Sequence, residues 1–164
     1  AHALVHGFGL LYTIPSIALF VLMPLILGTS IISPVNVLVA LTIYTMALMV
    51  RSGVDAFNAV PEHVVESSRA LGYTPARAFF TVELPLALPV LFAGIRVATV
   101  ANIAMVSVGA VIGVSSLGTL FTDGLARSIP AELITGVVLS AVLAYLADAL
   151  LAFTARRLTA WRTA

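Results

Sequence analysis

Residues 86–112 read LALPVLFAGIRVATVANIAMVSVGAVI, an apolar run that contains a single charged residue, Arg96. About 20 apolar residues let a helix cross the hydrocarbon core of a bilayer, where only helices and closed barrels satisfy their own backbone. The run is continuous and does not alternate apolar with polar residues, so it favours a helix over a barrel strand. This stretch therefore predicts a membrane-spanning helix and sets the class of the chain.

The remainder of the 164-residue sequence has the same character. It is 61% hydrophobic and 9% charged, whereas soluble domains are about 25% charged. Further spans are expected over residues 4–27, 35–50 and 131–155, which gives one all-α membrane domain over residues 1–164 with about four spans. The net charge is +1 and cysteine is absent, so nucleic-acid binding, disulfides and thiolate metal sites are not indicated.

The positions of the arginines predict how the spans are oriented. The eight basic residues are all arginine, and positive charge is retained on the cytoplasmic side of membrane proteins. We therefore expect a multi-pass protein of the plasma membrane with both the 52–84 loop and the C-terminus in the cytoplasm. Six arginines lie on that side of the expected spans: Arg51, Arg69, Arg77, Arg156, Arg157 and Arg162.

The 52–84 loop is expected to form two short helices joined at a glycine. Pro61 suits a first helical position, and Glu62 lies in the first turn, where a carboxylate favours the helix dipole. Gly72 is typical of a left-handed helix stop, and Thr74 is typical of a cap on the second helix. These residues alone leave two interpretations open, an amphipathic loop on the bilayer surface and a docking site for a partner protein.

The spacing in this loop resembles the motif EAA-x3-G-x9-I-x-LP of permeases from ATP-binding-cassette importers. Glu66-Ser67-Ser68 is followed at the same spacing by Gly72 and then by Val82-Glu83-Leu84-Pro85. Serines replace both alanines of the motif, and Val82 replaces the isoleucine. The resemblance implies that the loop is a coupling helix that docks on a separate ATPase subunit, with contacts from Pro61, Glu62, Val65, Glu66, Ser67, Ser68, Ala70, Leu71, Gly72 and Tyr73.

A narrower resemblance, to osmoprotectant permeases, covers most of the chain. It implies the binding-protein-dependent importer permease fold of the methionine-importer type, with an N-terminal span that is missing here. The family has glycines where Ser115 and Ser116 stand. The resemblance is carried by residues 12–19 (YTIPSIAL), 82–89 (VELPLALP), 93–100 (AGIRVATV) and 112–118 (IGVSSLG).

This resemblance also implies a function and a set of partners. The expected activity is import of glycine betaine, choline, carnitine or proline betaine, with alternating access driven through the coupling helix. Import of another small solute, such as methionine or a sulfonate, stays open. The implied partners are a pair of ATPase subunits that hold the ATP and Mg, a second permease subunit (identical or homologous) and an extracytoplasmic solute-binding protein. No cofactor is expected in this chain.

The sequence contains none of the motifs G-x-x-x-x-G-K-[ST], H-E-x-x-H or G-x-S-x-G. The chain is therefore expected to be a transport subunit and not an enzyme. An intramembrane enzyme stays as an alternative that would need paired catalytic groups at one depth. A structural subunit with a degenerate loop is disfavoured by the intact spacing of Gly72 and Leu84-Pro85. His2 and His6 have the spacing of metal ligands, but no third ligand accompanies them, so no metal site is predicted.

Two ionisable residues, Arg96 and Asp148, fall within expected spans and are candidates for function. Arg96 lies roughly 16 Å of helix from Pro85, and Asp148 lies roughly 12 Å from Arg156. Because these depths are similar, a mutual ion pair would lower the cost of burying each charge. The alternative is that each side chain extends separately to the cytoplasmic interface.

Thr99, Asn102 and Ser107 are candidates for the translocation path, because polar groups within spans face the interior of a bundle. They are equally suited to interhelical hydrogen bonds. Gly109 and Gly113 form a small-xxx-small pair, which favours close helix packing and leaves a hinge as the alternative.

Overall fold

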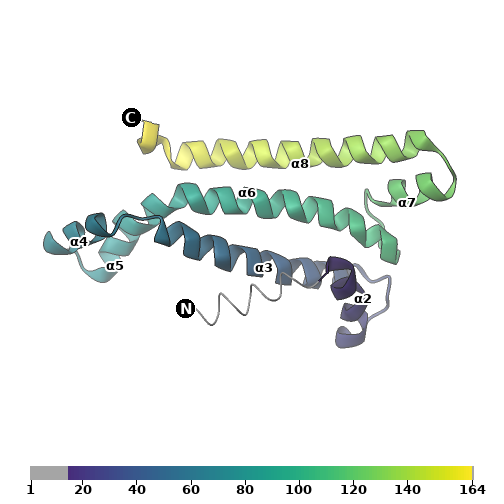
Figure 1. Cartoon of the computed structure of the whole chain (residues 1–164), viewed down its shortest axis with the longest axis horizontal. Helices are drawn as coiled ribbons and strands as arrows, with labels where there is room; N and C mark the ends of the chain where they lie inside the picture. Colours follow the sequence, from purple (N-terminus) through teal and green to yellow (C-terminus); the bar gives the residue numbers. More distant parts are fainter. Residues whose placement is uncertain (1–14, 164) are drawn as a thin grey trace.

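The computed structural model describes residues 15–163, which contain helices and turns but no strand (Figure 1). Three helical stretches are long and apolar enough to cross a membrane: Pro34–Asn58, Pro75–Ile112 and Pro130–Leu158. The elements in chain order are α2 (Ser16–Leu27), α3 (Pro34–Asn58), α4 (Glu62–Ala70), α5 (Pro75–Ala78), the π-helical turn η1 (Phe79–Glu83), α6 (Leu84–Val108), the 3-10 turn η2 (Gly109–Ile112), α7 (Thr119–Ala126), α8 (Pro130–Leu158) and the 3-10 turn η3 (Ala160–Thr163).

The three long helices lie in a row with α6 in the middle, packed against α3 on one side and α8 on the other (Figure 1). The short helices α4 and α5 lie at one end of this row together with the C-terminus, whereas α2 and α7 lie at the opposite end. Trp161 lines a cavity of about 370 Å³ with Thr81, Val82, Pro85 and Leu86. The loop and the C-terminus therefore share one end of the bundle.

The buried core lies at the end of the row where α2 packs across α3. Phe20 of α2 and Ala40 of α3 are both fully buried there. In contrast, most large apolar side chains of α8 are exposed. A helix that is apolar on all sides is typical of contact with lipid or with another membrane subunit. The core cluster comprises Leu19, Phe20, Met23, Val37, Ala40, Leu41, Tyr44 and Val114.

A buried asparagine organises the turn between α2 and α3. Gly28, with φ +65°, ends α2. The side-chain nitrogen of Asn36 donates to the carbonyl oxygens of Ser30 (2.8 Å) and Ile31 (3.3 Å). Its Oδ1 accepts a hydrogen bond from the Thr29 hydroxyl. Asn36 is fully buried, so these bonds satisfy polar groups that water cannot reach. No sequence pattern singled this residue out.

Two expected spans differ from the described helices. The span expected over residues 35–50 is too short, because α3 continues to Asn58. Arg51 and Asp55 mark where the chain leaves apolar surroundings, but charged side chains do not interrupt helical hydrogen bonding, and the next proline is Pro61. Of the span expected over residues 4–27, the described part is the 12-residue α2, and residues 4–14 lie outside the described range.

The return from the loop to the membrane through Leu84-Pro85 is a continuous helical stretch, Pro75–Ile112. A π-turn joins α5 to α6, and the Leu84 N–H bonds to the carbonyl of Phe79, five residues earlier. Proline has no N–H to donate and its ring collides with the carbonyl four residues earlier. A widened turn ahead of Pro85 relieves that collision and keeps the helix unbroken, so a displacement at α5 can be carried directly into α6.

Candidate functional site

The tip of the 52–84 loop is a helix end closed by Gly72. The Gly72 N–H bonds to the Arg69 carbonyl (2.9 Å) and the Tyr73 N–H bonds to the Ser68 carbonyl (3.2 Å), which is the pairing of a Schellman motif. Gly72 has φ +83°, and a Cβ placed on it would meet nothing within 4 Å. Glycine is therefore needed here for its backbone conformation and not for lack of space. The predicted left-handed stop is confirmed.

Next to this turn, the loop exposes an apolar side chain, Leu71, at 79% of its surface. Because the turn is ordered, this side chain is held where a partner protein could contact it. Ser68, expected among the docking residues, is only 6% exposed, because its face of α4 packs against α5 and η1. The Ser68 side chain is therefore buried within the loop, and a docking role for this position stays a prediction. Six of the expected docking residues are exposed besides Leu71: Pro61, Glu62, Glu66, Ser67, Ala70 and Gly72.

The second half of the loop is held against the membrane helices by aromatic contacts. Thr74 caps α5 by accepting a hydrogen bond from the Arg77 N–H at 3.4 Å, as predicted. The Arg77 guanidinium lies 4.4 Å from the centre of the Tyr73 ring, a cation–π contact. Phe79 in η1 stacks on Phe57 at the end of α3, with ring centres 5.6 Å apart. The loop is thus tied to both α3 and α6.

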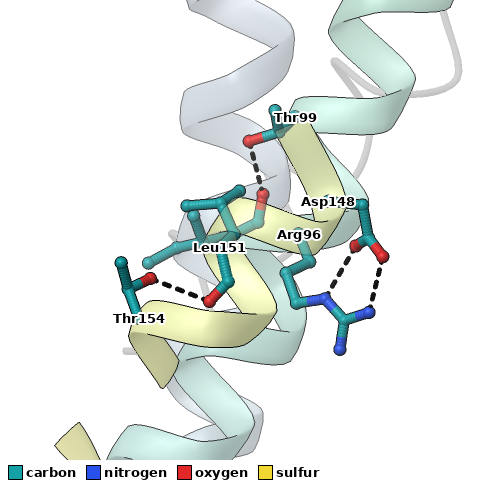
Figure 2. Close-up of polar contacts among 6 residues, drawn as sticks. Arg96, Thr99, Asp148, Leu151 and Thr154 are labelled. Carbon is teal, nitrogen blue, oxygen red and sulfur yellow. Dashed lines mark hydrogen bonds and ion pairs between the residues drawn. The ribbon is translucent and has the colours of Figure 1, made fainter. Parts of the chain in front are cut away.

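Within the bundle, Arg96 of α6 and Asp148 of α8 form a bidentate ion pair (Figure 2). Arg96 Nε and Nη2 each donate to a different oxygen of Asp148 at 2.7 Å. The paired geometry adds directional specificity to the attraction between the charges. The two side chains remain 40% and 30% exposed, respectively. The pair therefore joins the two helices and still presents charge to the surface of this single chain.

We expect Asp148→Asn to lower the yield of folded protein several-fold, because it leaves the Arg96 charge without its partner within the span. The amount of monodisperse full-length protein after detergent extraction, measured by gel filtration, checks this prediction. Asp123→Asn is the matched control, since Asp123 is exposed on α7. Equal yields for the two variants would show that the ion pair contributes nothing to folding.

The three polar residues proposed for the path have partners within the described chain or lie near a helix end. Asn102 donates to the hydroxyl of Thr45 across α6 and α3 at 2.7 Å. The Thr99 hydroxyl donates to the Ile95 carbonyl of its own helix (Figure 2). Ser107 lies near the end of α6. The interhelical hydrogen bond weighed as an alternative is therefore present for Asn102, and a role in the path stays a prediction for all three.

The glycines at the end of α6 have separate roles. Gly109 begins η2, and a Cβ on it would lie 3.2 Å from Val37 of α3, so it provides close packing. Gly113 has φ +88° and ends the same turn. His2 and His6 lie outside the described residues, and within residues 15–163 no group of three side chains is placed to hold a metal ion.

Ser116 orders the segment that leads from η2 to α7. Its hydroxyl donates to the Val106 carbonyl at 3.2 Å and accepts from the Gly118 N–H at 3.1 Å. A glycine at this position could make neither bond. The serine that departs from the osmoprotectant pattern thus supplies its own hydrogen bonds to hold this segment against α6.

Comparisons with known proteins agree with this arrangement. The osmoprotectant import permease OsmW of Salmonella typhimurium is 41% identical over 87% of this chain and 67% of its own length. An ergothioneine transport permease and binding protein of Helicobacter pylori is 37% identical over 84% of this chain, which spans 24% of that longer protein.

Solved structures carry the same fold. An inward-facing structure of the MetNI methionine ABC transporter superposes with a TM-score of 0.81 and 28% identity, covering 96% of this chain and 74% of the other. Residues 7–160 match the family described as the inner membrane component of binding-protein-dependent transport systems. With the apolar helices and the ordered loop, these matches show that the chain is a multi-pass membrane protein and belongs to that family of transport permeases.

Proposed function

We propose that this chain is the membrane-spanning subunit of an ATP-driven importer of quaternary-ammonium osmoprotectants such as glycine betaine or choline. The observation that carries the proposal is the exposed Leu71 beside the rigid Gly72 turn, at the tip of a loop that continues without a break into α6. A short ordered helix tied at both ends to membrane helices can convert motion of a partner beneath it into rotation of those helices.

The partners follow from this mechanism. ATP and Mg bind to separate ATPase subunits, whose closure moves α4. The continuous stretch Pro75–Ile112 transmits that motion into the bundle, and the Phe57–Phe79 stack carries it to α3. A second permease subunit covers part of the exposed apolar surface, and an extracytoplasmic binding protein delivers the solute. The loop and the C-terminus then both face the cytoplasm, as the arginine distribution predicts.

The solute class is supported by the names of the relatives. OsmW is an osmoprotectant permease, and a choline permease of Bacillus subtilis is 34% identical over 92% of this chain. The Helicobacter pylori relative transports ergothioneine, which makes that compound a second candidate. Glycine betaine, carnitine, choline and ergothioneine all carry a trimethylated ammonium group, so one path could accept the whole set. Methionine is the solute of the structural neighbour, which is less identical in sequence.

We expect Leu71→Ser to weaken the association with the ATPase roughly tenfold to a hundredfold, the equivalent of about 1.5–3 kcal/mol for one buried leucine. The loss arises because Leu71 would bury its side chain in the partner surface. The measurement is co-purification of the full-length permease with its ATPase in mild detergent, followed by titration of the ATPase.

Leu125→Ser is the matched control, because Leu125 is 74% exposed but lies on α7, at the opposite end of the bundle. It should leave the association unchanged. Uptake of labelled glycine betaine and choline into proteoliposomes that contain the complex and its binding protein then tests the solute class. A wild-type permease that binds no ATPase, or a Leu71→Ser variant that binds as well as wild type, would remove the main support for the proposal.

A further inference from the structure

The Arg96–Asp148 pair has unused binding capacity. Arginine has five N–H donors, and the two bonds to Asp148 come from Nε and Nη2. The third guanidinium nitrogen, Nη1, makes no hydrogen bond within residues 15–163 and points away from Asp148 in Figure 2. Each Asp148 oxygen accepts a single bond from Arg96, which leaves lone pairs available. Nε and Nη2 of Arg96 are therefore used by the ion pair, whereas Nη1 and the remaining lone pairs of Asp148 can still bind a ligand.

The pair lines an open hollow on the surface of this single chain. A cavity of about 550 Å³ opens beside it, and its walls are small or branched apolar side chains. This volume falls in the range of ordinary ligand sites, which combine apolar walls with a few polar groups. The walls are formed by Ala93, Val97, Val100 and Ala101, together with the two charged residues.

A second cavity adjoins the first along the same side of α6. It has a volume of about 310 Å³ and shares Ala93 and Val97 with the first. Its other end is lined by Arg51 and Asp55 of α3, on the side of the bundle where α4 and α5 lie. The two adjoining hollows, together called the groove, are thus each lined by one arginine and one aspartate. Charged groups within a span are costly against lipid and face protein or water instead.

We propose that this groove is part of the solute path and that the Arg96–Asp148 pair is a transient binding site for a zwitterionic solute. The solute carboxylate pairs with Arg96 at Nη1, the quaternary ammonium lies beside the Asp148 carboxylate, and the apolar walls contact the methyl groups. The solute competes with an existing ion pair, so its binding is weak, as release during transport requires. This inference rests on the proposed function and adds to it a site and a preference for zwitterions over cations.

The test compares a zwitterion with a cation in the intact complex. Glycine betaine carries a carboxylate and choline does not, so loss of the charge pair should affect them unequally. The variant is Arg96→Gln/Asp148→Asn, which removes both charges together and leaves neither unpaired. The matched control is Arg127→Gln/Asp123→Asn, the same two changes at exposed positions on or next to α7. Uptake and ATPase rate are measured in proteoliposomes with the ATPase and the loaded binding protein.

The expected result is selective. Uptake in the variant is expressed per ATP hydrolysed, so that a change in the ATPase rate is separated from a change in transport. Uptake of glycine betaine per ATP falls about tenfold, the effect of losing one charge-assisted contact, and uptake of choline falls much less. The control variant transports both solutes as wild type does. Uptake of both solutes at wild-type rates in the variant would overturn the inference and leave the proposed function intact.

A parallel loss of both solutes together with ATPase stimulation would also overturn it, because that pattern shows a structural contact. A wild-type complex with stimulated ATPase but no uptake of either solute would overturn the proposed solute class and the inference together.

Val97→Cys provides a second measurement, since these 164 residues contain no other cysteine. Labelling by a water-soluble thiol reagent is expected. No labelling, because lipid covers the groove, contradicts the inference.

Discussion

Replacing Gly118 with alanine is expected to abolish the accumulation of folded protein. A Cβ on Gly118 would lie 2.0 Å from the carbonyl oxygen of Ser107 and 2.8 Å from its Cα. These are backbone atoms at the end of α6, so no side-chain rotation relieves the collision. Overpacking usually costs about 1–3 kcal/mol, and a backbone collision belongs at or above the top of that range. Gel filtration of the detergent-extracted full-length protein should show loss of the monodisperse peak.

Gly53→Ala is the matched control for this change. Gly53 lies within α3, and a Cβ placed on it meets nothing within 4 Å. Alanine is the better helix former by about 1 kcal/mol, so this variant should be as stable as wild type or slightly more stable. If Gly118→Ala gave the same peak and the same melting temperature as Gly53→Ala, the close approach of the Gly118 segment to α6 would not exist in the folded protein.

The sequence predicted those features that depend on local chemistry. The left-handed turn at Gly72 follows from the preference of glycine for positive φ after a helix, and the Thr74 cap follows from its position before Pro75. Both need only neighbouring residues. The helical class and three of the spans were equally accessible, because the bilayer requires long apolar stretches.

The sequence did not predict features that arise from contacts between distant segments, or helix ends that hydropathy does not locate. Hydropathy locates the membrane boundary near Arg51, but it says nothing of where helical hydrogen bonding stops, so the extension of α3 to Asn58 was missed. Gly118 belongs to a stretch that carries the family resemblance, but its packing role depends on the Ser107 carbonyl eleven residues earlier, which the sequence does not show. Asn36 is polar near an expected span end, and only the folded turn shows that it is fully buried.

The candidate site likewise contains features that the sequence suggested and features that only the structure shows. The docking face of the loop stays a prediction, and the burial of Ser68 within it could not be read from the sequence, because it depends on how α4 packs against α5 and η1. The ion pair of Arg96 and Asp148 could be suggested from their similar depths, whereas the adjoining groove required the relative placement of α3, α6 and α8. The depth of a residue within a membrane span can be estimated from its distance in sequence to the end of the span. Which neighbouring helix its side chain faces depends on how the helices pack, which the sequence alone does not show.

Gly72→Val is expected to abolish ATP-driven uptake while leaving the membrane helices folded. The backbone at Gly72 has φ +83°, a conformation that costs an L-residue about 1–2 kcal/mol and costs more for a β-branched one. The turn would open, and Leu71 would lose the position from which it contacts the ATPase. Because the loop lies outside the spans, the gel-filtration peak should persist. Co-purification with the ATPase and uptake of labelled glycine betaine are the measurements.

Gly72→Asn separates the two ways in which such a variant can fail. Asparagine adopts the left-handed conformation more readily than other non-glycine residues, and the space around Gly72 within this chain is open. If the backbone conformation is what matters, Gly72→Asn should retain a large part of the uptake that Gly72→Val loses. If both variants lose ATPase binding equally, the partner must lie directly against the Gly72 Cα, and the requirement would be for close contact in place of turn geometry. If Gly72→Val binds and transports as wild type does, the Gly72 turn does not position the coupling contact, and the ATPase would have to engage another part of the loop.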